Sequence, residues 1–132
     1  MKKSFFLLAI SLIVLSLSFV SCSSDRDDNS TPKYNIIGKW KAMQYKDYDG
    51  TFKDMSILNW YSQFNSDGTY SSYSGTFYSG TYTYDNNTKI TAKVGSETVH
   101  YTIISLSGNN AEAEMYYGSN PSDKVVYKLQ RQ

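Results

Sequence analysis

The sequence predicts an all-β domain, an up-and-down barrel of about eight antiparallel strands that follows a cleaved signal peptide and a disordered tether. Thirteen tyrosines, two tryptophans and six phenylalanines in 132 residues favour strands, where an aromatic ring packs on a pleated surface. Turn-forming residues recur about every ten residues, and between them apolar and polar side chains alternate with no helical period. Short links favour an antiparallel meander, and closing it into a barrel removes both exposed edges. A two-sheet sandwich fits the same pattern.

The turn signals set the strand boundaries. Each of them contains residues that accept a positive φ or bond to their own backbone. They lie at 49–50, 65–68, 85–87, 95–96, 107–110 and 118–121. The strands expected between them are 36–45, 57–64, 69–74, 76–84, 88–94, 97–106, 111–117 and 124–130. Residues 46–56 alternate weakly and are expected to form a loop, a short helix or an added edge strand.

Alternation also assigns one dry face to each strand. The side chains of Val99, Tyr101 and Ile103 are expected to point into the barrel, which leaves His100 facing solvent. The other predicted inward sets are Ile90, Ala92 and Val94, and Ala111, Ala113, Met115 and Tyr117.

The first 21 residues are expected to be a signal peptide. Lys2 and Lys3 form a positive start, and residues 5–20 are apolar apart from serines, over about the length of a signal-peptide core. A membrane span needs roughly 20 apolar residues and a basic cluster behind it. Residues 23–28 are instead serine, aspartate and arginine. Cleavage is therefore predicted.

The residues around the only cysteine define the cleavage site. Phe19-Val20-Ser21-Cys22 resembles the lipobox of bacterial lipoproteins, in which a small residue precedes the cysteine that becomes the new N-terminus; Phe19 stands where leucine is usual. The resemblance makes residues 1–21 a lipoprotein signal peptide and implies acyl chains such as palmitate on Cys22. Each buried CH₂ contributes about 0.8 kcal/mol, so several chains would hold the protein on a membrane.

Residues 22–33 are expected to be the lipidated N-terminus and a flexible tether, because the residues after the cysteine offer no apolar side chain to bury. The acidic run Asp25, Asp27 and Asp28 resembles the export signal of lipoproteins that some Gram-negative bacteria display on the outer face of the outer membrane. A solvated linker has the same composition. We therefore expect an outer-membrane lipoprotein of the cell envelope, on either the periplasmic or the outer side.

The charge balance argues against nucleic acid as a partner. Loss of Lys2 and Lys3 would leave 11 of the 13 basic residues against 12 acidic ones, a net charge near −1. Lys39 and Lys41 share one strand face, but the sequence has no basic cluster of the kind that a phosphate backbone requires.

The sequence also lacks the residues of a catalytic or cofactor site. His100 is the only histidine, so a metal site with two imidazoles is impossible. Asp47, Asp49 and Asp54 match no calcium-loop spacing and are typical of turns. Neither a Gly-rich phosphate loop nor a nucleophile elbow is present. We therefore expect a protein that is not an enzyme and that uses no metal or cofactor.

Three segments together resemble a known family. They are Gly38-Lys39-Trp40 at the start of the first strand, residues 64–70 and residues 80–84. The first is similar to the Gly-x-Trp signature of lipocalins, and the set is similar to the lipocalin-like domains of small bacterial lipoproteins over residues 36–130. The resemblance implies a short barrel domain at 34–132, with Trp40 closing its floor and a ligand mouth at the other end. The chain lacks the length, the disulfide and the later motifs of true lipocalins.

Two functions fit these observations. In the first, the barrel binds a small apolar or amphipathic ligand, and the rings that line the site are those of Trp40, Trp60, Phe64, Tyr82 and Tyr84. Those rings leave little room in an eight-stranded barrel, so any cavity is expected to be below roughly 300 Å³, with the ligand at the mouth beside residues 46–56.

In the second function, the barrel is filled by its own side chains and serves as a cell-surface interaction or structural module. Aromatic rings stack on sugar rings and anchor protein interfaces. The partner would then be a glycan or a protein, contacted through the tyrosines expected to point outward, which are Tyr45, Tyr61, Tyr73 and Tyr116.

Overall fold

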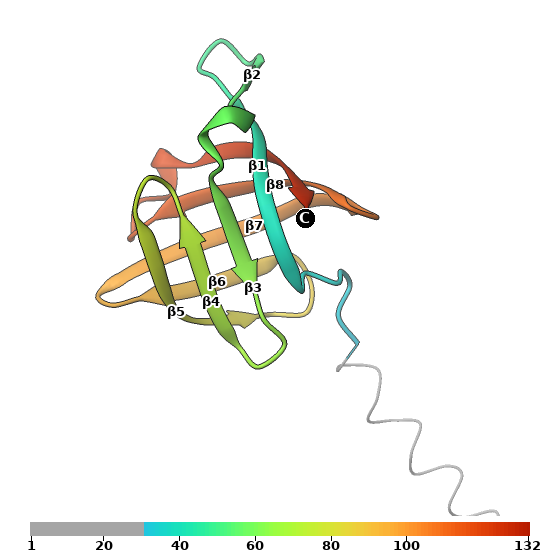
Figure 1. Ribbon diagram of the computed structural model, residues 1–132, viewed down its shortest axis with the longest axis vertical. Coiled ribbons are helices and arrows are strands. Elements are labelled where there is room, and N and C mark those ends of the chain that lie inside the picture. The colour runs from blue at the N-terminus through green and yellow to red at the C-terminus, as the bar shows by residue number, and fades with distance from the viewer. Residues whose placement is uncertain (1–30) are drawn as a thin grey trace, which may run out of the picture. The chain divides into compact units, whose positions relative to one another are not determined.

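The computed structural model describes residues 31–132, which form nine β-strands and two short 3₁₀ helices (Figure 1). The predicted signal peptide, Cys22 and the acidic run Asp25 to Asp28 lie outside the described residues. The strands are β1 (Gly38–Lys46), β2 (Phe52–Asp54), β3 (Tyr61–Phe64), β4 (Thr69–Tyr73), β5 (Phe77–Tyr84), β6 (Lys89–Val94), β7 (Glu97–Ser107), β8 (Asn110–Tyr117) and β9 (Val125–Arg131). The helices are η1 (Ser56–Leu58) and η2 (Pro121–Asp123). In this part of the chain no helix is long and apolar enough to cross a membrane.

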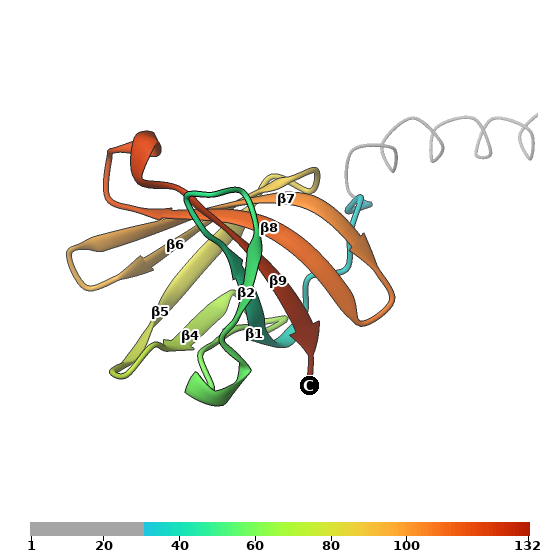
Figure 2. The same cartoon turned by 90° about the horizontal axis from the view of Figure 1, so that it is seen from above.

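Eight of the strands close into one antiparallel barrel. Each of β3 to β8 pairs with the next strand along the chain, β3 also pairs with β1, and β9 returns to β1, with Trp40 opposite Arg131 and Tyr45 opposite Tyr127. Figures 1 and 2 show β9 passing beside β1, where the ring closes. The predicted all-β up-and-down barrel is confirmed, and the sandwich alternative is wrong. β2 lies outside the ring and extends the sheet along the end of β1.

The strands lie where the turn signals put them, to within two residues at either end, except near residue 57. There the predicted strand 57–64 begins with helix η1, and only Tyr61–Phe64 pairs as a strand. Asn59 ends the helix in a left-handed conformation with φ of 55°. Ile57 is 83 % exposed, so the apolar residues that predicted a strand here are not part of the core.

A β-bulge in β1 changes the face that Tyr45 occupies. The register of β1 against β9 shifts between Ala42 and Gln44, which leaves Met43 as the extra residue. Beyond the bulge Tyr45 lies directly opposite Tyr127, and opposite residues in an antiparallel pair project to the same face. Tyr127 lines the inside of the barrel. The expectation that Tyr45 points outward is therefore wrong.

The core is aromatic at its centre. Phe64 packs against Tyr70, Tyr82 and Tyr101, with ring centres 5.3, 5.2 and 5.5 Å away. The residues predicted to point inward on β6 and β7 are all buried, namely Ile90, Ala92, Val94, Val99, Tyr101 and Ile103. Every member of the core cluster, and every hydrophobic residue packed against it, lies between Tyr34 and Leu129. These core residues all belong to the compact unit Lys33–Gln132.

Trp40 lies at the floor of the barrel, the end that carries the turns between β3 and β4, β5 and β6, and β7 and β8. Its side chain is 3 % exposed, and the indole N–H donates to the carbonyl of Ile36 at 2.8 Å. The guanidinium of Arg131 stacks on the other side, 4.4 Å from the ring centre. The buried indole and its hydrogen bond to Ile36 hold the segment before β1 against the floor of the barrel.

Candidate binding site at the barrel mouth

The end of the barrel opposite Trp40 opens into a hollow of ≈ 460 Å³, which we call the mouth hollow. Its lining comes from the upper ends of the strands and from the residue before β3, because successive strands bring their ends together at one rim. The lining residues are Trp60, Ser72, Ser74, Tyr78, Val94, Glu97, Val99, Met115, Tyr117 and Tyr127. Aromatic and apolar groups dominate, and Glu97 is the one formally charged group among them.

Below the mouth hollow, the inside of the barrel is nearly full. The space that continues downward past Met115 and Tyr127 toward Trp40 amounts to ≈ 40 Å³. A second space, between Trp40, Phe64 and Ile103, amounts to ≈ 30 Å³. The interior is thus as small as predicted, whereas the mouth hollow is larger than the predicted upper limit of roughly 300 Å³. The room for a small molecule is therefore at the mouth and not at the floor.

Three hydroxyl groups meet inside the barrel, in the small space below the mouth hollow. The hydroxyls of Ser62 and Tyr101 share a hydrogen bond of 2.9 Å, and those of Tyr70 and Tyr101 share another. Three hydroxyls carry three protons, and two hydrogen bonds use two of them. Among these three hydroxyls, one proton is therefore not used by the two hydrogen bonds. All three residues line the space below the mouth hollow.

Three tyrosines inside the barrel have raised pKa values. Burial raises the pKa of Tyr101 well above its usual value, and the neighbouring Tyr70 raises it further. Burial likewise raises the pKa of Tyr117, with a smaller contribution from Tyr70, and it raises the pKa of Tyr127, with a smaller contribution from Tyr117. Neutral phenols both donate and accept hydrogen bonds. The site therefore offers uncharged polar groups on aromatic walls.

The five residues predicted to line a ligand site all lie on the inner side, but at two different depths. Trp60 is part of the mouth hollow, and Trp40 lies at the bottom of the space beneath it. Phe64, Tyr82 and Tyr84 lie at the floor end. The hydroxyl of Tyr82 donates to the carbonyl of Asn65 at 2.7 Å, and that of Tyr84 donates to the carbonyl of Asn87 at 2.8 Å. These two tyrosines therefore secure the floor turns.

The residues that complete the mouth were not singled out as ligand-site residues from the sequence. Alternation places Tyr117 inward with Met115, but it does not show how far along the barrel axis a residue lies. Depth depends on the register between strands, which brings Tyr127 and Tyr78 to the same end as Trp60. Residues 46–56, expected beside the ligand, line neither the mouth hollow nor the space below it. That segment instead forms β2 and buries Met55.

His100, predicted to face solvent, lies on the outer face of β7 and stacks on Tyr116 with ring centres 4.5 Å apart. Among residues 31–132 no three His, Cys, Asp or Glu side chains gather in an arrangement that could hold a metal ion.

Comparison with known proteins gives one match. Residues 36–110 match the family model described as a lipocalin-like domain, a stretch that runs from just before β1 to the start of β8. Neither the curated proteins nor the solved structures contain a match to this chain. The matched stretch is more than half of the 132 residues and contains the whole Gly38-Lys39-Trp40 signature.

Proposed function

We propose, since the chain belongs to the lipocalin-like domain family, that it is a binding protein that holds a small apolar or amphipathic ligand at the mouth of its barrel. Proteins of this family are generally binding proteins rather than enzymes. The observation that carries the proposal is the mouth hollow, whose ≈ 460 Å³ falls in the range of pockets that hold small ligands, about 300 to 1,000 Å³.

The lining limits the kind of ligand. Trp60, Tyr117 and Tyr127 provide flat apolar walls, while the hydroxyls of Ser72, Ser74 and Tyr78 in the same lining can hydrogen-bond to an oxygen or nitrogen of the ligand. The space below is too small for an acyl chain. We therefore infer a compact ligand with a ring or short apolar body and at least one oxygen or nitrogen that can hydrogen-bond.

We further propose that the protein is a lipoprotein, anchored in the outer membrane by acyl chains on Cys22. The support is the lipobox-like Phe19-Val20-Ser21-Cys22 after an apolar leader, and the acidic run that follows the cysteine. The anchor would keep the barrel at the cell envelope, where the mouth could take a ligand from the surrounding solution.

Fluorescence of Trp60 tests the binding proposal. Trp40→Phe leaves Trp60 as the one tryptophan of the chain, next to the mouth hollow. Titration with the compact neutral probe N-phenyl-1-naphthylamine should quench it saturably. Tyr117→Ala should weaken binding by about tenfold, as expected for an aromatic anchor.

Tyr116→Ala is the matched control, because Tyr116 is the neighbour of Tyr117 on the opposite face of β8, stacked on His100. It should leave the affinity unchanged. Equal losses in both variants, or no saturable quenching of Trp60, would mean that the mouth is not the binding site.

A further inference from the structure

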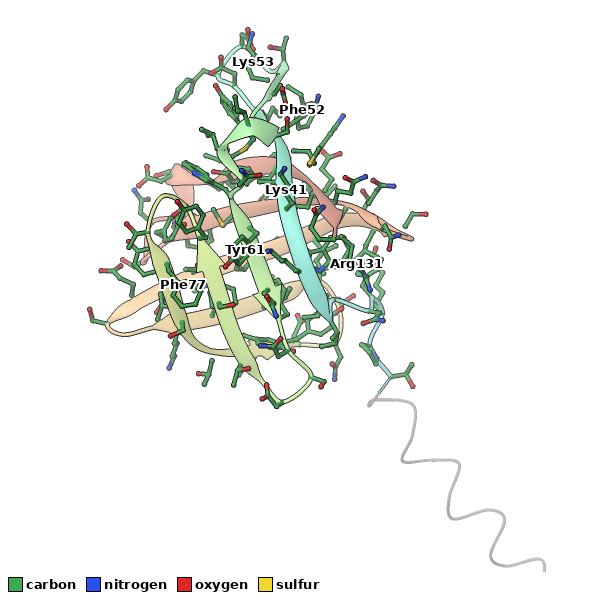
Figure 3. The ribbon with its side chains drawn as sticks, viewed as in Figure 1. Lys41, Phe52, Lys53, Tyr61, Phe77 and Arg131 are labelled. Carbon is green, nitrogen blue, oxygen red and sulfur yellow. The ribbon has the colours of Figure 1, made fainter. Side chains whose placement is uncertain are left out.

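A row of four side chains crosses the outer surface of β1, β3, β4 and β5, and we call it the outer row (Figure 3). Lys41 lies directly opposite Tyr61, Tyr61 opposite Tyr73, and Tyr73 opposite Phe77, so all project to the same face. Figure 3 shows Lys41, Tyr61 and Phe77 following one another across these strands. Neighbouring strands lie about 4.8 Å apart, so the row extends about 14 Å.

The rings of the outer row form a surface that is open to solvent. Tyr61 and Tyr73 stack with ring centres 6.1 Å apart and planes 23° apart, and Phe77 is 59 % exposed. A second row, of polar side chains in register on the same face, runs beside the first. Its members are Lys39, Gln63, Ser71 and Ser79.

The two lysines of this face are free to meet an anion. The amine of Lys39 lies 4.1 Å from the ring centre of Tyr61. The two ion pairs in residues 31–132 join Lys53 to Asp49 and Lys124 to Glu114, and involve neither Lys39 nor Lys41. Asp54 is the carboxylate near Lys41.

Asp54 is already engaged by its own turn. Its carboxylate accepts from the backbone N–H of Ser56 at 3.0 Å. Hydrogen bonds from Ser56 are the main cause of its lowered pKa, and the charge of Lys41 is the smallest. Among residues 31–132, Asp54 forms no ion pair with Lys39 or Lys41.

These groups surround an open hollow of ≈ 400 Å³, lined by Lys39, Lys41, Asn59, Tyr61, Tyr73 and Gln132. We propose that the outer row and this hollow form a second binding site, separate from the mouth, for an acidic oligosaccharide. The CH faces of sugar rings pack on aromatic rings, and a row of rings suits several sugars in line. The lysines would meet carboxylate or sulfate groups, and the amides and hydroxyls of the polar row would meet sugar hydroxyls.

The composition of the face favours a sugar chain over other occupants. A single-stranded nucleic acid also stacks on aromatic rings, but it needs a positive groove that follows its backbone, and this face offers two lysines. A purely apolar partner would leave both lysines unpaired. An acidic oligosaccharide uses the rings, the lysines and the neutral polar groups together.

Calorimetric titration with defined sugars tests the proposal. The protein is the full chain, solubilised in a polyoxyethylene detergent so that no sugar headgroup competes. The probes are a galacturonic acid hexasaccharide, its methyl ester, which has the same rings without the charges, and a heparin hexasaccharide. We expect at least one acidic probe to bind. We also expect the methyl ester to bind about tenfold more weakly than the free galacturonate.

Variants locate the site. Tyr61→Ala, and separately Lys39→Gln with Lys41→Gln, should each weaken binding of the acidic probe by about tenfold. Tyr116→Ala, which removes a tyrosine from the outer face of β8, should leave it unchanged. Phe77→Ala should weaken binding of the acidic sugar and leave binding of the naphthylamine probe unchanged. Tyr78→Ala changes the next residue, which lines the mouth, and should weaken binding of the naphthylamine probe and leave sugar binding unchanged.

Three outcomes would overturn the proposal. They are binding of neither acidic probe, equal affinity for the galacturonate and its methyl ester, and tighter binding of a thymidine oligonucleotide than of either sugar. The thermal midpoint of each variant should match that of the parent chain, because the changed side chains are on the surface. A variant with a lowered midpoint is replaced by Tyr61→Ser or by Lys39→Ala with Lys41→Ala.

Discussion

The Tyr101 hydroxyl lies inside the barrel, below the mouth hollow, between the hydroxyls of Ser62 and Tyr70. It is the link that satisfies both neighbours. A polar group buried without a partner costs about 1 to 3 kcal/mol, which is more than a typical hydrogen bond contributes. The stability of the barrel interior therefore depends on the Tyr101 hydroxyl.

Tyr101→Phe is expected to lower the free energy of unfolding by about 1 to 3 kcal/mol, because it strands the hydroxyls of Ser62 and Tyr70. Urea unfolding measures the loss. Tyr116→Phe, which changes a tyrosine on the outer face, serves as the control and should leave the urea midpoint unchanged. An unchanged midpoint for Tyr101→Phe would contradict the buried network.

The same residue gives a pH dependence with a defined sign. The folded state raises the pKa of Tyr101 above the ordinary 10.0, so the folded protein holds this proton more tightly than the unfolded chain does. The contribution of this proton to the free energy of unfolding is complete below pH 10.0. It is lost as the pH rises from 10.0 through the raised pKa of the folded state. Tyr101→Phe should therefore flatten the fall in the urea midpoint above that pH. Some fall should remain, because Tyr82, Tyr84, Tyr117 and Tyr127 also have raised pKa values.

Trp40→Ala tests the floor of the barrel. The side chain is buried, its N–H is bonded to Ile36, and Arg131 stacks on it. Truncating a buried large aromatic residue costs about 3 to 5 kcal/mol, and the urea midpoint should fall accordingly. Trp60→Ala, at the partly exposed mouth, should cost clearly less. Equal losses would mean that the two tryptophans do not differ in depth.

Among the elements, β5 and β6 leave no room for a side chain at Gly80. A Cβ atom added there would collide with the backbone carbonyl of Lys93 on β6. Backbone cannot move aside as a flexible side chain can, so β5 and β6 pair this closely only because residue 80 has no side chain.

Gly80→Ala is therefore expected to destabilise the barrel by about 3 kcal/mol, at the upper end of the range for overpacking. Thermal unfolding measures the effect. Ser79→Ala, one residue earlier on the outer face, should change the midpoint little. A Gly80→Ala variant as stable as the parent would show that β5 and β6 are further apart than described.

Turn residues predicted these elements well because their chemistry is local. A run such as Asn65 to Gly68 bonds to its own backbone whatever surrounds it. The bulge at Met43 and the helix at Ser56 are not local in this sense. The bulge depends on the register between β1 and β9. The helix follows a hydrogen bond from the N–H of Met55 to the carbonyl of Met43 on β1. Neither contact can be read from a sequence pattern.

At the scale of the whole molecule, ring closure sets the depth of each inward residue. Alternation predicted the inner faces of β6, β7 and β8, but Trp60, Tyr78, Tyr117 and Tyr127 meet at one rim only because β9 returns to β1. The sequence thus predicted an aromatic site at the mouth. It could not predict which residues line the mouth hollow, because that depends on the strand register around the full ring.

The proposed anchor is tested on the whole chain as well. Cys22→Ser removes the chain's only cysteine and with it the proposed acylation site. Metabolic labelling with palmitate should disappear, and the protein should leave the membrane fraction. Membrane retention of the variant after an alkaline wash, with the leader removed, would contradict lipid anchoring.

We propose that a ligand of this protein stays in the mouth because the barrel below the mouth is full. A series of fatty acids of increasing chain length, titrated into residues 31–132, tests this most directly. In a deep cavity each added CH₂ would contribute about 0.8 kcal/mol, close to fourfold in affinity. With ≈ 460 Å³ at the mouth and ≈ 40 Å³ below it, we expect affinity to rise only until the mouth is filled and then to stay constant. Affinity that keeps rising through long chains, with quenching of both Trp40 and Trp60, would show a deep cavity and contradict the claim.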